Sequence, residues 1–286
     1  MANRIYLESL TIPSDNRQID FIQAEKRTVF SSFYPFKIFF ERGRSTFDFA
    51  PITIFYGSNG SGKTTLLNVL AEKCRVTRHS AFNSSAFFTD FVDFCRIEGS
   101  IPRDSHILTS DDVTDYLLNI RALNDGIDLK REEIFEDFLD RKFHSNRLSS
   151  IDDYDDWKES YDAKRLTQSE FTRRRVMKNV EMRSNGETAL KYYVDRIGEK
   201  ALYLIDEPEN SLSPAFQQQL CDYLADSARF FGCQLIIATH SPFFLSIPNA
   251  MIYDLDSNPI AVKDWTELEN VRAYYDLFKK HEHEFD

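Results

Sequence analysis

The sequence predicts an α/β fold with a mixed, largely parallel core sheet, an antiparallel β part near the N-terminus and a helical insertion. Two observations lead to this prediction. The segments 201–205 and 234–238 are continuous apolar runs that each follow a helical segment, which is typical of parallel strands buried on both faces. The apolar run 52–56 leads through a glycine-rich stretch into the helical segment 66–75, so strand and helix also alternate in the first third.

Aromatic segments predict the antiparallel β part. We expect strands at 5–7, 36–40 and 45–49, because these segments are rich in β-formers and partly alternate with polar residues. The stretch 41–44 contains a glycine between two of these segments and therefore predicts a hairpin turn.

Residues 76–182 interrupt the alternation of strands and helices. They show no strong strand pattern, and stretches such as 128–139 carry apolar residues at helical spacing among many charges. We therefore predict a core at 1–75 and 183–286, and a mostly helical, lid-like or arm-like insertion at 76–182. The elements expected after the insertion are helices at 187–197, 214–230 and near 266–280, and a final strand at 251–255.

Composition excludes several classes of protein. The 286 residues are 42% hydrophobic with a mean hydropathy of −0.43, no apolar run approaches ~20 residues, and the first residues lack the apolar region of a signal peptide. We expect a cytoplasmic protein with no membrane insertion. The net charge of −11 argues against a protein that coats nucleic acid, but Arg173–Arg175 with Lys178 leave a local basic patch open beside the alternative of a solvated helix face.

Two further clusters are weak candidates for metal sites. Cys74, Cys95, Cys221 and Cys233 are scattered without a C-x-x-C pair, so we interpret them as reduced thiols in the core. The acidic run 150–157 is compatible with a cation site, but the first turn of a solvated helix explains it more simply.

The glycine-rich stretch after 52–56 fits the pattern G-x-x-x-x-G-K-[ST]. Between a strand and a helix, such a stretch lets backbone N–H groups and the helix N-terminus surround phosphate oxygens. Lys63 would reach the β- and γ-phosphates and Thr64 would bind Mg²⁺. The predicted nucleotide-binding residues are Gly57, Ser58, Asn59, Gly60, Ser61, Gly62, Lys63, Thr64 and Thr65.

Two acidic residues end the strand predicted at 201–205. The carboxyl end of a parallel strand beside a phosphate loop is where a nucleotide-bound Mg²⁺ is held, and Asp206 occupies that position. Glu207 would then lie near the γ-phosphate and polarise a water molecule for in-line attack. We therefore expect ATP and Mg²⁺ as the bound groups.

Two more positions are informative through their placement. His240 comes just after the strand at 234–238, where it either contacts the γ-phosphate or the attacking water, or serves as a structural hydrogen-bonding group. Ser184 and Gly186 lie at the expected N-terminus of the helix before the Asp206 strand, within the short segment 183–187.

The order of these motifs resembles the nucleotide-binding domain of ABC-type ATPases, with Walker A, signature, Walker B and switch histidine in sequence. The segments 206–214, 237–242 and 252–256 are similar to the stand-alone bacterial branch labelled AAA-family ATPases, relatives of the SMC and recombination-nuclease ATPases. The resemblance covers about residues 1–75 and 180–286.

The resemblance implies a P-loop NTPase in which two chains enclose two ATP molecules. Ser184 and the backbone of Gly186 would contact the γ-phosphate of the partner chain, and Glu207, His240 and Lys63 would be the catalytic residues. Hydrolysis would release the homodimer, so the protein would act as a switch.

The chain also departs from the family pattern. Asn185 and Glu187 replace a Gly and a Gln of the transporter signature, and Ser213 occupies the acidic D-loop position. No clear Q-loop glutamine follows Walker A, so Ser110 or Asp111 is the candidate stand-in. The candidates for stacking on adenine are Tyr34, Phe36 and Phe39, each of which is also explained as part of the core.

Three functions follow from these motifs. We favour an ATP-switched ATPase whose dimerisation regulates a soluble effector protein, such as a nuclease or toxin in anti-phage defence or DNA maintenance, with nucleic acid a further candidate partner. The alternative is the energising ATPase subunit of a membrane transporter. A small-molecule kinase is the third, but it leaves the signature and His240 unexplained.

Overall fold

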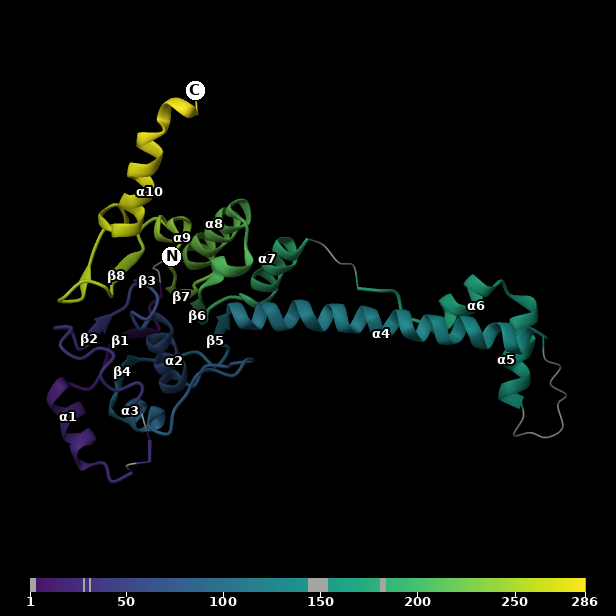
Figure 1. Cartoon of the computed structure of the whole chain (residues 1–286), viewed down its shortest axis with the longest axis horizontal. Coiled ribbons are helices and arrows are strands. Elements are labelled where there is room, and N and C mark those ends of the chain that lie inside the picture. The colour runs from purple at the N-terminus through teal and green to yellow at the C-terminus, as the bar shows by residue number, and fades with distance from the viewer. Residues whose placement is uncertain (1–3, 28, 31, 144–153, 181–183, 286) are drawn as a thin grey trace. The chain divides into compact units, whose positions relative to one another are not determined.

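The computed structural model divides the chain into two compact units. The described residues are 4–27, 29–30, 32–143, 154–180 and 184–285. The core unit comprises Met1–Thr114 and Asn185–Asp286, and the insertion unit comprises Asp115–Ser184 (Figure 1). Of the residues that the sequence assigns to a nucleotide site, only Ser184 belongs to the insertion unit.

A six-stranded sheet forms the centre of the core unit. Its strand order is β5-β6-β7-β3-β8-β9, and all neighbours are parallel except the edge pair β8 and β9. The four middle strands are almost wholly buried, which explains their continuous apolar sequences. The strands are β3 (Ile52–Tyr56), β5 (His106–Thr109), β6 (Leu202–Asp206), β7 (Gln234–Ala238), β8 (Met251–Asp254) and β9 (Ala261–Val262). The prediction of an α/β fold with a mainly parallel core sheet is confirmed.

A second, antiparallel sheet of three strands has the order β2-β1-β4. The strands are β1 (Leu7–Thr11), β2 (Thr46–Asp48) and β4 (Arg96–Gly99). Gln234 at the start of β7 joins the two sheets, because its side chain accepts hydrogen bonds from the Tyr6 and Leu7 amides at 2.8 Å each and donates to the Leu7 carbonyl.

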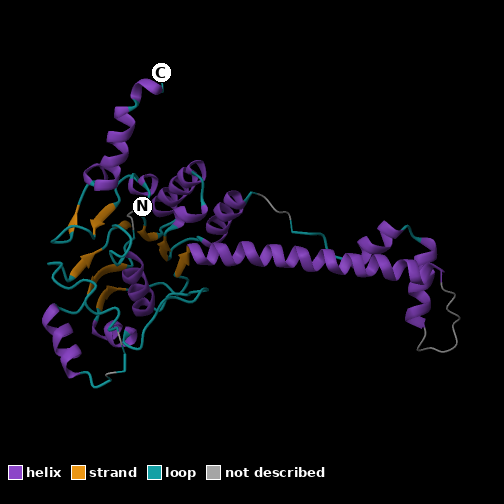
Figure 2. Ribbon diagram, in the orientation of Figure 1, coloured by secondary structure: helices purple, strands orange, loops and turns teal. Residues whose placement is uncertain are grey.

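Helix α2 (Lys63–Cys74) lies between the two sheets. It contacts β6 and β7 of the large sheet and β4 of the small one, and its leucines join one hydrophobic core with residues of both sheets. On the opposite face of the large sheet α7, α8 and α9 pack together (Figures 1 and 2). The other helices of the core unit are α1 (Asp15–Ala24), α3 (Phe88–Phe94), α7 (Asn185–Arg196), α8 (Pro214–Phe230), α9 (Pro242–Leu245), α10 (Glu269–Lys280), and the 3-10 turns η1 (Pro208–Ser211), η2 (Trp265–Glu267) and η3 (Glu282–Glu284).

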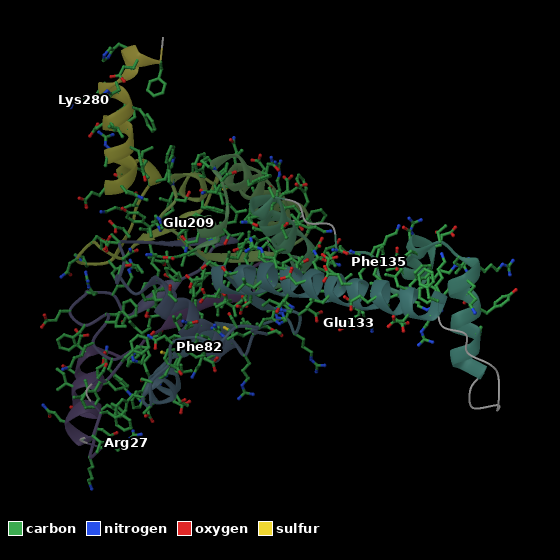
Figure 3. The ribbon with its side chains drawn as sticks, turned by 45° about the vertical axis from the view of Figure 1, so that its right-hand side comes forward. Arg27, Phe82, Glu133, Phe135, Glu209 and Lys280 are labelled. Atoms are coloured by element: carbon green, nitrogen blue, oxygen red, sulfur yellow. The ribbon has the colours of Figure 1, made fainter. Side chains whose placement is uncertain are left out.

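The insertion unit is built from helices. It contains most of α4 (Ser110–Phe143), together with α5 (Tyr154–Arg165) and α6 (Gln168–Arg175). A small core of Phe138, Ala163 and Phe171 holds the three helices together, while Phe135 on α4 is 40% exposed (Figure 3). Of the acidic run at 150–157, residues 150–153 lie outside the described part of the chain.

The structure corrects two expectations. The segment 36–40 is not a strand, because positive φ values at Lys37 (73°) and Glu41 (57°) turn the backbone into successive tight turns. Residues 76–114 are not part of the insertion unit, since they supply β4 and β5 to the two sheets of the core unit. These two strands have only four residues each, which is too short for a clear apolar pattern.

No helix in the described part of the chain has the length and apolar character needed to span a membrane. The four cysteines are all free thiols, and Cys95, Cys221 and Cys233 are buried in the core unit. Burial raises the pKa of Cys74, Cys95 and Cys221 to about 12.

Candidate functional site

The carboxyl ends of the parallel strands bring the candidate residues to one edge of the large sheet. In the register Thr109 of β5 pairs with Asp206 of β6, Asp206 pairs with Ala238 of β7, and Ala238 pairs with Phe55 of β3. The segments that follow these strands therefore begin side by side. Ligands of open α/β sheets bind at such an edge.

The phosphate-loop residues 57–62 form a tight turn between β3 and α2. Gly62 has a φ of 99°, and a Cβ atom there would lie 2.7 Å from the Phe39 ring, so only glycine fits. Lys63 is 4% exposed, and its Nζ donates to the carbonyl oxygens of Gly57 (2.9 Å) and Ser58 (3.1 Å). All nine residues predicted for this motif lie on this turn or in the first turn of α2.

Asp256, two residues beyond β8, holds the phosphate loop through hydrogen bonds from Ser58. The Ser58 amide donates to Asp256 Oδ2 at 2.6 Å and the Ser58 hydroxyl donates to Asp256 Oδ1 at 2.9 Å. Asp256 was not predicted from the sequence as a residue of the site. Its signal is an acidic residue just after a buried parallel strand, the same signal that identified Asp206.

Asp206 and Thr64 form the oxygen-rich part of the site. The Thr64 hydroxyl donates to Asp206 Oδ1 at 3.1 Å. Burial above all, and then the neighbouring Glu207, raise the pKa of Asp206 to about 7 against the lowering effects of the Thr64 hydrogen bond and of Lys63. A hydroxyl and a carboxylate are hard oxygen donors and fit Mg²⁺, which commonly takes only one or two protein ligands beside phosphate oxygens and water. Among the described residues no group of three or more acidic, histidine or cysteine side chains is arranged to hold a metal ion by itself.

Glu207 is held in a left-handed backbone conformation with a φ of 45°. Its amide donates to the Ala238 carbonyl at 2.9 Å, and its carboxylate lies 3.7 Å from Lys63 Nζ and accepts from Asn210 Nδ2 at 3.0 Å. The acid therefore points toward the phosphate-loop lysine. Strained residues of this kind occur often at active sites.

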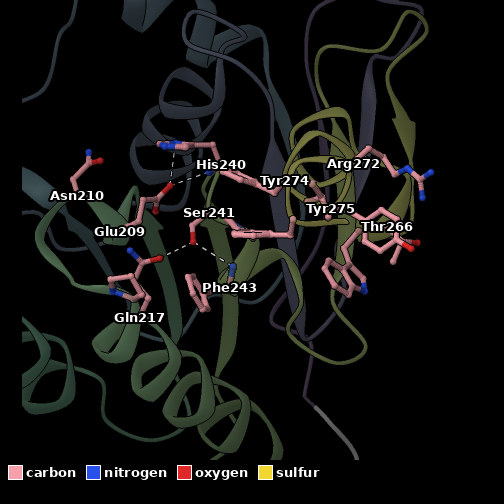
Figure 4. A pocket seen from close by; sticks show the side chains of 15 residues that line it. Glu209, Asn210, Gln217, His240, Ser241, Phe243, Thr266, Arg272, Tyr274 and Tyr275 are labelled. Carbon is pink, nitrogen blue, oxygen red and sulfur yellow. Dashed lines mark hydrogen bonds and ion pairs between the residues drawn. The ribbon is translucent and has the colours of Figure 1, made fainter. Parts of the chain in front are cut away.

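His240 lies two residues beyond β7 at the same edge. Its ring is 49% exposed, and Nδ1 lies 3.1 Å from Glu209 Oε1 (Figure 4). Glu209 was not predicted from the sequence, because nothing in an acid within a 3-10 turn indicates that it reaches a histidine about thirty residues away.

A cavity of about 390 Å³ adjoins the phosphate loop and Glu207, and its other wall contains Tyr34 and Ile38. The Tyr34 hydroxyl lies 3.1 Å from the Thr65 hydroxyl. Phe36 and Phe39 are 4% and 3% exposed and belong to the core, so Tyr34 is the aromatic residue of the three that lines the cavity. At the end of β5, Ser110 is half-buried and Asp111 is exposed.

The signature-like segment divides between the two units. Ser184 is exposed and belongs to the insertion unit, whereas Gly186 lies in the first turn of α7, and Arg183 falls outside the described residues. A Cβ atom at Gly186 would lie 2.8 Å from the Phe216 ring of α8. The close packing of α7 against α8 therefore also explains a glycine at this position, independently of any phosphate contact. Ser213 precedes α8 as its N-cap residue.

The basic cluster on α6 has partners inside the insertion unit. The Arg175 guanidinium lies 3.7 Å from the centre of the Phe171 ring and forms an ion pair with Asp162 at 3.7 Å. Arg175 therefore packs within the insertion unit, whereas Arg173 and Arg174 are exposed.

Comparisons with known proteins agree with the motif order. A family model described as ABC transporter matches residues 45–210, and a model described as AAA ATPase domain matches residues 188–245. No curated protein matches the chain.

Several solved structures are similar to the chain at low identity. They include an SMC head domain from Thermotoga maritima (13% identity, 91% of this chain and 99% of that one, TM-score 0.41). A second is the Smc head domain with an extended coiled coil, bound to the C-terminal domain of ScpA, from Pyrococcus furiosus (15% identity, 96% of this chain and 99% of that one, TM-score 0.40). A third is a putative metal-chelate type ABC transporter in an inward-facing conformation (18% identity, 81% of this chain and 80% of that one, TM-score 0.38).

Proposed function

The chain belongs to the ABC transporter family of ATPases, and on that premise we propose that it is a switch in which ATP binding joins two copies and hydrolysis separates them. In this proposal the change between the two states regulates a protein partner. ATP hydrolysis itself follows from the family, whose model covers more than half of the chain.

The observation that supports the proposal most is the contact between residues at the ends of two strands, β3 and β6. Lys63 follows β3, Glu207 follows β6, and the two side chains lie 3.7 Å apart beside a cavity that Tyr34 also lines. Thr64 and Asp206 add an oxygen-rich pair at 3.1 Å. A lysine, an acid and a pair of oxygen ligands around one phosphate loop are the parts that phosphoryl transfer to water requires.

We assign a role to each of these residues. The loop amides and Lys63 hold the phosphates of ATP, and Thr64 and Asp206 hold Mg²⁺, which would neutralise phosphate charge. Glu207 accepts a proton from the attacking water, and His240 contacts the γ-phosphate region. Tyr34 stacks on the adenine, since it is the aromatic side chain exposed to the cavity.

The second half of the site would come from another copy of the chain. Ser184 precedes α7 and Gly186 lies in its first turn, and the positive end of a helix dipole favours a bound anion. We propose that these two residues contact the γ-phosphate of the partner, so that ATP stabilises the dimer.

Replacing Glu207 with Gln tests this proposal. The amide keeps the size of the side chain but cannot act as a base, so turnover should fall about 100-fold or more while ATP binding remains. In the presence of ATP and Mg²⁺ the variant should accumulate as a dimer on a sizing column. The control is Glu199→Gln, which alters an exposed acid before β6 and should turn over like the parent. A monomeric Glu207→Gln protein, or one with normal turnover, would contradict the proposal.

The family description leaves a transporter ATPase as the second candidate function. Purifying the chain with its bound proteins from the native cell separates the two. A partner without membrane spans supports the regulatory switch, whereas a permease with membrane spans supports the transporter subunit.

A further inference from the structure

We propose that Glu209 is a positioning residue that selects the reactive nitrogen of His240 and stabilises its protonated ring. The inference rests on the proposed function, because it assigns Glu209 a part in ATP hydrolysis through His240. Glu209 lies in the turn η1, which begins two residues after β6 ends, and His240 lies two residues beyond the neighbouring strand β7.

One carboxylate oxygen of Glu209 organises the whole end of β7. Oε1 accepts hydrogen bonds from the Thr239 hydroxyl at 2.8 Å and from the His240 amide at 2.9 Å, and it lies 3.1 Å from His240 Nδ1 (Figure 4). One buried oxygen therefore holds the His240 backbone and lies beside its ring.

A second contact fixes the other side of the His240 backbone. Asn270 of α10 donates from Nδ2 to the His240 carbonyl at 2.6 Å, and its own amide donates to the Tyr56 hydroxyl at 3.2 Å. Tyr56 is the last residue of β3 before the phosphate loop. His240 is thus held between η1 and α10, and α10 is connected to the strand that carries the loop.

The acceptor character of Glu209 determines the proton position on the ring. An ionised carboxylate only accepts hydrogen bonds, so with Glu209 Oε1 at 3.1 Å a hydrogen on Nδ1 is favoured over a lone pair there. In the neutral ring Nε2 is then the free nitrogen, and in the charged ring Nε2 becomes a second donor. The ring is half exposed at the sheet edge, whereas the Glu209 side chain is only 6% exposed, so the reactive nitrogen is the one that Glu209 does not hold.

A purely structural role does not explain why residue 209 is a charged glutamate. Its Oε2 atom is buried and has no hydrogen-bond partner among the described residues. A glutamine would accept the same hydrogen bonds through its single oxygen without a buried charge. A negative charge beside Nδ1 becomes favourable when the imidazole carries a proton, as in the pairing of an acid with a catalytic histidine.

The test combines Glu209→Gln with His240→Ala. Glu209→Gln alone should lower kcat about 10- to 100-fold, the range for residues that orient a functional imidazole, with KM for ATP nearly unchanged. In the His240→Ala background the same change should have no further effect, because Glu209 acts only through that ring. Urea unfolding should show Glu209→Gln at least as stable as the parent. Glu199→Gln serves as the control acid.

Three results would overturn the inference. They are normal turnover of Glu209→Gln, an equal loss of kcat in the presence and absence of His240, and a variant that no longer folds. The last two would indicate a structural role. The proposed function fails separately, because full turnover of both Glu207→Gln and His240→Ala would contradict it whatever Glu209 does.

Discussion

The buried Asp206 should make the stability of the free protein fall as the pH rises. The folded state holds the pKa of Asp206 at about 7, whereas the ordinary value is 3.8. Between these two values the folded chain keeps a proton that the unfolded chain has lost, so raising the pH favours unfolding. A shift of about three pKa units corresponds to about 4 kcal/mol over the full range, of which about 1.4 kcal/mol falls between pH 6 and pH 8.

Replacing Asp206 with Asn removes this pH dependence. The amide is neutral at every pH. The difference in free energy of unfolding, variant minus parent, should therefore be about 1.4 kcal/mol larger at pH 8 than at pH 6. Urea unfolding followed by circular dichroism at both pH values measures the difference. The control is Asp276→Asn, which alters an exposed acid on α10 and should follow the parent.

Magnesium and ATP should abolish the effect in the parent protein. A cation beside Asp206 favours the ionised form, so it takes the place of the proton and lowers the pKa of the carboxyl. A difference between Asp206→Asn and the parent that stays the same at pH 6 and pH 8 would refute the reasoning. It would mean that the carboxylate is solvated or already paired in the free protein.

Three further predictions concern the phosphate loop and the dimer. Gly62→Ala places a methyl group 2.7 Å from the Phe39 ring at a φ of 99°, and it should lower the free energy of unfolding in urea by about 2–5 kcal/mol. The control Gly60→Ala has open space around the new methyl group and should lower it by only about 1–2 kcal/mol. Equal losses in the two variants would refute the steric argument. Lys63→Ala should weaken ATP binding about 100-fold in calorimetry, because it removes a charge-assisted contact, and an unchanged affinity would count against the loop assignment. Ser184→Arg should leave ATP binding by the monomer intact and block the ATP-dependent dimer on a sizing column; a normal dimer would remove Ser184 from the site.

The sequence predicted the parts of the site that depend on local patterns. Lys63, Asp206 and His240 each follow a buried strand, and parallel strands present their carboxyl ends at one edge, so their common location could be inferred from the chain alone. Glu209 and Asp256 could not be assigned in this way. Their partners lie about thirty and about two hundred residues away, and only the folded register brings them together.

The wrong strand at 36–40 has a different origin. Its aromatic residues do enter the core, as the apolar pattern indicates, but they do so from turns in which Lys37 and Glu41 adopt positive φ. In a segment of only a few residues, the apolar pattern predicts burial more reliably than it predicts backbone conformation. The same limit concealed β4, whose pairing partner β1 lies far away in the sequence.

The buried cysteines determine how the molecule responds to thiol chemistry. With a pKa of about 12, a thiol at pH 7 is ionised in about one molecule in 10⁵, and only the thiolate attacks electrophiles and disulfides. Maleimide dyes and mild oxidants should therefore leave Cys74, Cys95 and Cys221 almost untouched, and Cys233 is buried with a pKa that burial also raises. A single cysteine introduced on the exposed side of α10 would then react selectively, so labelled copies can report association of two chains by energy transfer without removing any natural residue.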